Sequence, residues 1–122
     1  MAIKVASAGP EARLEVSGEF GLISADQASA LATVLAELVA NSVEHGYPGR
    51  AGTVWVRAHR DGDELEIRVE DEGEGVGDGN IVQGLGTQIV QVMVSGELGG
   101  SIQWRPREGG GTVAIIRMTP DN

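Results

Sequence analysis

Cysteine is absent from the 122-residue sequence, and lysine occurs only once, at Lys4. The absence of cysteine excludes disulfides, thiolate zinc sites and thiol nucleophiles. A single lysine close to the first residue excludes a P-loop, a Schiff-base enzyme and most other lysine-dependent chemistry. A chain without disulfides suits the reducing cytoplasm, and we expect that location.

Long apolar segments are missing as well. The first nine residues lack the apolar run of a signal peptide, and the most apolar helix candidate is too short to span a bilayer. Positive charge is scarce, since the formal net charge is −9, and this argues against nucleic acid as a partner. At this length we expect one soluble domain over residues 1–122, with no membrane contact by this domain.

The longest predicted helix runs from Ser24 to His45. Ser24 followed by Gln27 is typical of a capping box, and Gly46 is a typical residue just past a helix. An apolar face recurs at helical spacing, formed by Ala28, Leu31, Val34, Leu35, Leu38 and Val39. Beside that face lie Thr33, Glu37, Asn41 and Glu44, with His45 four residues beyond Asn41. This edge suits a divalent metal and a polyanion better than it suits packing.

Alternating apolar and polar residues predict strands elsewhere. The clearest pair, 53–60 and 64–71, flanks the turn dipeptide Asp61-Gly62. One face of this pair is apolar and the other is charged, so helices should cover only one side of the sheet. Weaker strand candidates are 3–6, 12–16, 101–105 and 112–118, and a second helix is expected within 84–98, with Ile89, Val90, Met93 and Val94 on its buried face.

Residues 71–80, DEGEGVGDGN, follow directly from a predicted strand. Four glycines in ten residues allow positive φ and a close approach of the backbone to a ligand, with Asp71 placed to reach it. A flexible acidic loop and a calcium loop are the competing interpretations. The EF-hand pattern fails because Gly73 occupies the third ligand position and no glutamate stands at the twelfth.

A glycine-flanked turn, GLGT, opens the second predicted helix. Gly84, Gly86 and Thr87 lie at its N-terminus, where free N–H groups favour an anion such as phosphate. Taken alone this pattern is weak, because many helices begin with glycine.

The order of these motifs resembles the Bergerat-type ATP-binding fold of the GHKL superfamily, which includes histidine kinases, gyrase, Hsp90 and MutL. The segment ELVANSVEHG resembles its N box, DEGEGVG its G1 box and GLGTQIV its G2 box. The resemblance covers residues 15–119 and is nearest to sensor histidine kinases of the HisKA_2/HWE-like group, with a short ATP lid between Gly75 and Gly84. It implies an α+β, two-layer α/β sandwich: a mixed, mostly antiparallel sheet with helices on one face.

The resemblance also implies roles for individual residues. Asp71 would accept a hydrogen bond from the adenine amino group, while Gly73 and Gly75 let the base and sugar close in and Thr112 supports the pocket. Asn41 would bind Mg²⁺ between the phosphates of ATP, and Glu37 would orient water around the metal or act as a base. The phosphates would lie against Gly84, Gly86 and Thr87, with His45 beside them.

Two features depart from the histidine-kinase pattern. A phosphate-contacting lysine often follows the N-box asparagine, but here Glu44 and His45 stand there, so His45 or Arg50 must supply charge, or nucleotide binds weakly. The dimerisation helices that carry the acceptor histidine have no counterpart, so we expect an excised or stand-alone catalytic domain that binds ATP·Mg²⁺ but turns it over poorly alone. Its partners would be a histidine-bearing dimerisation domain, in cis or in trans, and a response regulator.

Two alternatives remain. One is an anti-sigma-factor-type serine kinase, since those domains have this size and an N box ending in histidine followed closely by tyrosine, as His45-Gly46-Tyr47 does here. The other is a non-catalytic module in which nucleotide binding gates an interaction surface.

Overall fold

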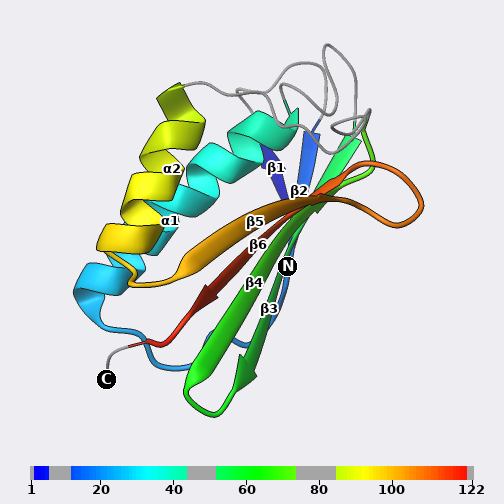
Figure 1. Ribbon diagram of the computed structural model, residues 1–122. Coiled ribbons are helices and arrows are strands. Elements are labelled where there is room, and N and C mark those ends of the chain that lie inside the picture. Colours follow the sequence, from blue (N-terminus) through cyan, green and yellow to red (C-terminus); the bar gives the residue numbers. More distant parts are fainter. Residues whose placement is uncertain (1, 6–11, 44–51, 74–84, 121–122) are drawn as a thin grey trace.

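The computed structural model describes residues 2–5, 12–43, 52–73 and 85–120, which form a sheet with two helices on one side (Figure 1). The sheet has the strand order β1-β2-β3-β4-β6-β5. The elements in chain order are β1 (Ala2–Val5), β2 (Ala12–Gly18), α1 (Ala25–Asn41), β3 (Gly52–Asp61), β4 (Glu64–Asp71), α2 (Leu85–Gly96), β5 (Ser101–Pro106) and β6 (Thr112–Met118).

The sheet is mixed and mostly antiparallel, as expected. Only β2 and β3 pair in parallel, and the four other neighbouring pairs are antiparallel. The β3–β4 hairpin turns at Gly62-Asp63, one residue later than the predicted dipeptide, because Asp61 still pairs with Glu64. Gly62 has φ +60°, which glycine adopts without the steric penalty of a side chain.

Helix α1 begins as its sequence predicts. The Ser24 side chain accepts a hydrogen bond from the N–H of Gln27, which satisfies one of the free donors of the first turn. The α-helical part ends at Asn41, where the Ser42 N–H is shared between the carbonyls of Leu38 and Val39, and residues 42 and 43 continue in a π-type turn. His45 and Gly46 lie outside the described residues.

The core lies between the helices and one face of the sheet. Fully buried side chains from both layers meet there, among them Val34 and Leu38 of α1, Val90 and Val94 of α2, and Val54, Leu65, Ile67, Val69, Ile116 and Met118 of the sheet. The expected two-layer arrangement with helices on one face is therefore confirmed. Two predicted core residues are wrong: Ala28 and Ile89 are exposed, since the buried stripe of α1 runs through Gln27 and Ala30 and that of α2 through Val90 and Val94.

The opposite face of the sheet, called the outer face below, carries paired charges. Cross-strand rows on this face join Trp55 to Glu70 and Val113, and Glu66 to Arg117. Val113 and Ile115 are buried although they lie outside the core between helices and sheet. Their cross-strand neighbours include long arginine side chains, whose apolar stems cover such residues while the charged ends stay in water.

Candidate functional site

Four of the predicted ligand-binding segments lie at one end of the molecule. The C-terminal end of α1, the C-terminal end of β4, the first residue of β6 and the first turn of α2 all lie at the upper end in Figure 1. The antiparallel pairing of β4 with β6 produces part of this arrangement, because it sets Asp71 directly opposite Thr112. Motifs that are far apart in the sequence are thus brought to the same end of the sheet.

Asp71 is the buried polar group of this site. It closes β4, is 3% exposed, and shares the helix-facing side of the sheet with its cross-strand neighbour Val54. The N–H of Gly73 donates to Oδ1 of Asp71 at 3.0 Å, which is the local turn that aspartate forms with the residue two positions on. The side chain of Ser42 and the backbone of Thr112 also hydrogen-bond to the carboxylate.

Burial raises the pKa of the Asp71 carboxyl above its ordinary value of 3.8. The hydrogen bonds from Gly73, Ser42 and Thr112 and the positive charge of Arg107 lower the pKa, but they do not outweigh burial. A further hydrogen-bond donor would therefore stabilise the ionised form of this buried carboxylate. A ligand that offers an N–H to Asp71 fits that requirement.

The turn that precedes Thr112 lies against the end of β4. Gly111 has φ +96°, and a Cβ atom built on it would stand 1.8 Å from the carbonyl oxygen of Asp71. No residue other than glycine fits here without displacing the backbone. Gly111 therefore allows the β5–β6 hairpin to approach the strand end that carries the carboxylate.

The remaining predicted site residues are described only in part. Glu37 and Asn41 are half-buried on the last two turns of α1, Gly86 lies within the first turn of α2, and Thr87 is buried there. Asn41 directly precedes Ser42, whose side chain contacts Asp71, so the end of α1 is tied to the end of β4. The predicted residues His45, Gly75 and Gly84 lie outside the described part of the chain.

Sequence reasoning missed two contributors to this site. Ser42 contacts Asp71 from α1, and only its place directly after Asn41 could have indicated a role. Arg107 contacts Glu70 and Glu72, the two neighbours of Asp71, from the β5–β6 hairpin. Nothing in the local sequence around Arg107 identifies its partners, which lie 37 and 35 residues earlier.

The described residues do not form a metal site from protein groups alone. Among them, no three or more His, Cys, Asp or Glu side chains are arranged to hold a metal ion. Asn41 and Glu37 supply oxygen donors of the kind that Mg²⁺ prefers, and Mg²⁺ usually takes its other ligands from phosphates and water. Neither described helix is long and apolar enough to cross a membrane.

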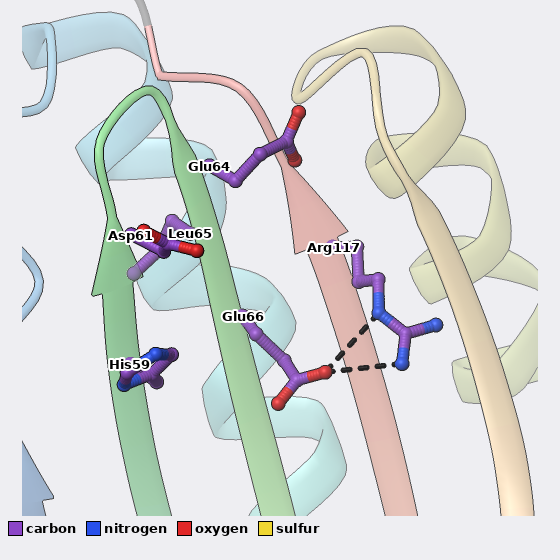
Figure 2. Close-up of a pocket in the computed structure, with 6 residues that line it drawn as sticks. All are labelled: His59, Asp61, Glu64, Leu65, Glu66 and Arg117. Carbon is purple, nitrogen blue, oxygen red and sulfur yellow. Dashed lines mark hydrogen bonds and ion pairs between the residues drawn. The ribbon is translucent and has the colours of Figure 1, made fainter.

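A hollow lies at the opposite end of the sheet, near the β3–β4 hairpin (Figure 2). Its lining consists of His59, Asp61, Glu64, Leu65, Glu66 and Arg117. The Glu66 carboxylate already accepts hydrogen bonds from Arg68 and Arg117 at 3.2 and 3.1 Å. The Glu66 carboxylate is therefore engaged by the protein itself, and we place the candidate site at the Asp71 end.

The sequence matches a known protein family. The family model described as "Histidine kinase-, DNA gyrase B-, and HSP90-like ATPase" matches residues 26–122. The sensor histidine kinase PdtaS of Mycobacterium tuberculosis is 37% identical over 119 residues, which cover 93% of this chain and 24% of that protein. This chain thus spans about a quarter of the length of the curated relative.

Two further matches bear on the fold and on the alternatives. The histidine kinase domain of the Erythrobacter litoralis EL346 blue-light activated histidine kinase superposes with a TM-score of 0.75 and 26% identity, covering 89% of this chain and 52% of that one. An anti-sigma F factor of Halalkalibacterium halodurans is 37% identical over 54 residues, 43% of this chain and 37% of that protein. The longer similarity is to histidine kinases.

Proposed function

The chain belongs to the histidine kinase-, DNA gyrase B- and HSP90-like ATPases, and we propose that it is the catalytic domain of a sensor histidine kinase. In this proposal residues 1–122 form one domain that binds ATP·Mg²⁺ and donates the γ-phosphate to a histidine on a separate dimerisation domain. The observation that carries the proposal is the buried Asp71 carboxylate at the end of β4, held by Gly73, Ser42 and Thr112.

Adenine recognition follows from the chemistry of Asp71. Its carboxylate accepts a hydrogen bond from the amino group of the base in addition to those that the protein donates, and a base without this donor forgoes a hydrogen bond to a charged group. Gly73 holds the carboxylate through its own N–H, and the absence of a side chain at Gly73 and Gly75 lets the base and sugar approach. Thr112, opposite Asp71 in the sheet, supports the pocket.

Phosphate binding is assigned to the ends of the two helices. Asn41 contributes an amide oxygen to Mg²⁺, and Glu37, one turn earlier, orients water around the metal rather than acting as a base. Mg²⁺, when bound there, neutralises phosphate charge and thereby assists transfer of the γ-phosphate. We assign Gly84, Gly86 and Thr87 as the residues that bind the phosphates, since free N–H groups at a helix N-terminus favour an anion, and His45 as a further phosphate contact.

Neither histidine of this chain suits the role of phosphate acceptor. His59 is exposed on the outer face of β3, and it lines the hollow at the opposite end of the sheet from Asp71. His45 belongs to the N-box motif itself. We therefore place the acceptor on a dimerisation domain of the HisKA_2/HWE-like kind, in cis or in trans, with a response regulator downstream and the reaction in the cytoplasm.

Titration calorimetry of ADP and ATP with Mg²⁺ tests the binding step. We expect the wild type to bind both nucleotides and Asp71→Asn to lose roughly 10- to 100-fold in affinity, the range for one hydrogen bond to a charged group. Equal binding by the two proteins would contradict the adenine site.

Phosphate transfer tests the kinase step and separates the alternatives. With radiolabelled ATP and a histidine-bearing dimerisation domain, we expect a phosphoprotein that acid hydrolyses, as phosphohistidine is. An acid-stable product on a sigma-factor regulator would favour the serine kinase, for which the partial match to an anti-sigma F factor speaks. Nucleotide binding without any transfer would favour a nucleotide-gated interaction module.

A further inference from the structure

We propose that Arg107 is a positioning residue of the adenine site. From the outer face of the sheet, it ties the β5–β6 hairpin to the end of β4 and thereby fixes the direction in which Asp71 presents its carboxylate. The inference rests on the proposed function, because it takes Asp71 as the group that recognises the adenine amino group.

The guanidinium of Arg107 contacts both chain neighbours of Asp71. Its Nε donates to Oε1 of Glu70 at 3.1 Å, and its Nη1 lies 3.8 Å from Oε1 of Glu72. Successive side chains of a strand point to opposite faces, so Glu70 lies on the outer face while Asp71 points toward the helices, and Glu72 follows directly after the strand end. One cation therefore spans the backbone of Asp71 from the side opposite to its carboxylate.

Arg107 is itself held in place. Its guanidinium stacks 5.1 Å from the ring centroid of Trp55, and its side chain is only 20% exposed. The second oxygen of Glu70 binds Nε of Arg57 at 3.1 Å, and Arg57 also stacks on Trp55, at 5.7 Å. A planar guanidinium that is both stacked and hydrogen-bonded has little rotational freedom left, which suits a part that fixes another residue.

The same residue closes the hairpin that touches Asp71. The N–H of Arg107 donates to the carbonyl of Gly111 at 3.0 Å, and the carbonyl of Arg107 accepts from the N–H of Gly110 at 3.0 Å. Gly111 in turn lies against the carbonyl oxygen of Asp71. Arg107 thus holds the turn and the strand end together, and its positive charge also lowers the pKa of Asp71 against the effect of burial.

Arg117 provides a matched control. It also pairs with a glutamate on the outer face of β4, with its Nη2 3.1 Å from Oε1 of Glu66, but it does so near the β3–β4 hairpin. Removing either arginine breaks an ion pair with β4. Only the loss of Arg107 removes contacts next to Asp71.

The experiment compares ATP with purine riboside 5′-triphosphate, which lacks the amino group, both with Mg²⁺. The ratio of their dissociation constants isolates recognition of the amino group, since a general loss of stability weakens both ligands alike. For Arg107→Gln we expect the preference for ATP to fall by about threefold or more, the size of a coupling between neighbouring groups. Arg117→Gln should keep the wild-type ratio. Arg107→Lys, which keeps the charge, should give a ratio between those of the wild type and Arg107→Gln.

An unchanged ratio in Arg107→Gln, with a lowered melting temperature like that of Arg117→Gln, would overturn the positioning role and leave the adenine site intact. A wild type that does not prefer ATP would instead overturn the proposed function, and this inference with it. If Arg107→Gln does not fold, the comparison is made between Arg107→Lys and Arg117→Lys: a reduced ratio in the first alone supports the proposal, and equal ratios overturn it.

Discussion

Two carboxylates of strand β4, Asp71 and Glu66, have pKa values that are shifted in opposite directions by their surroundings. Asp71, at the C-terminal end, is buried on the helix-facing side, and burial keeps its pKa above the ordinary value despite four lowering interactions. Glu66, near the hairpin, is 26% exposed on the outer face. Burial raises the pKa of Glu66, but the hydrogen bonds and charges of Arg68 and Arg117 outweigh it and lower the pKa.

The difference supports the proposal that the Asp71 end of the strand binds the ligand. Each oxygen of the Glu66 carboxylate is bound by an arginine, and these partly exposed ion pairs contribute modestly to stability. Burial raises the pKa of Asp71, so its ionised form costs stability, which a protein tolerates where the group has a function. The variants below test this contrast, beginning with the one expected to have the largest effect.

Gly111→Ala should be the most damaging single change at the Asp71 end. The new Cβ would stand 1.8 Å from the Asp71 carbonyl oxygen, and φ +96° is strained for alanine, so we expect a loss of roughly 3 kcal/mol or more in unfolding free energy. Urea denaturation measures it.

Gly110→Ala is the control for that change. Gly110 has φ +113° but nothing within 4 Å of an added Cβ, so it should cost only about 1–2 kcal/mol, from the backbone alone. Equal losses in the two variants would mean that the close approach to Asp71 is unimportant.

Asp71→Asn should weaken adenine binding, as argued above, and at the same time stabilise the fold at neutral pH. Because the folded pKa is raised, the stability that the protonated Asp71 provides is present below its ordinary pKa of 3.8 and is lost as the pH rises through the folded value. The melting temperature of the variant should therefore exceed that of the wild type at pH 7, with a smaller difference near pH 4. A variant that is less stable at pH 7 would show that the hydrogen bonds to Asp71 outweigh its burial.

Asn41→Ala should distinguish the contribution of Mg²⁺ to ATP binding from the contribution of adenine recognition. If Asn41 binds Mg²⁺, removal of its amide should lower ATP affinity roughly tenfold with Mg²⁺, the size of about 1.4 kcal/mol. With EDTA present, the affinities of variant and wild type should coincide, since Asp71 is untouched. A loss of the same size with and without metal would place Asn41 in a purely structural role.

Glu66→Gln should have the smallest effect and leave the ligand site alone. Its exposed ion pairs contribute about 0.2–1 kcal/mol, so the melting temperature should fall by a few degrees at most. Because the folded pKa of Glu66 is lowered, this contribution is present above its ordinary pKa of 4.5 and is lost as the pH falls through the folded value. ATP affinity that changes with Glu66 would break the contrast between the two ends.

Much of the fold could be predicted because the patterns that specify it are local. Alternation of apolar and polar residues predicted both strands of the β3–β4 hairpin within a residue or two, and the Ser24–Gln27 pair marked the start of α1. The change from α-helical to π-type winding at Ser42 was not predicted, because no residue type in this segment marks it, and the predicted end at His45 lies outside the described residues. The exposure of Ile89 was not predicted either, because consecutive apolar residues in α2 do not show by themselves which of them faces the sheet.

The sequence by itself determined the order of the three glycine- and polar-rich motifs and the single charged face of the sheet, since both depend on spacing along the chain. Only the tertiary structure decided which groups surround Asp71, because Ser42 and Arg107 reach it from segments that lie 29 residues before it and 36 after it. The same holds for Arg60, whose Nη1 donates to the carbonyl of Phe20 at 2.8 Å across 40 residues. Such contacts follow from strand register and helix packing, which bring together segments that are far apart in the sequence. No local pattern predicts them.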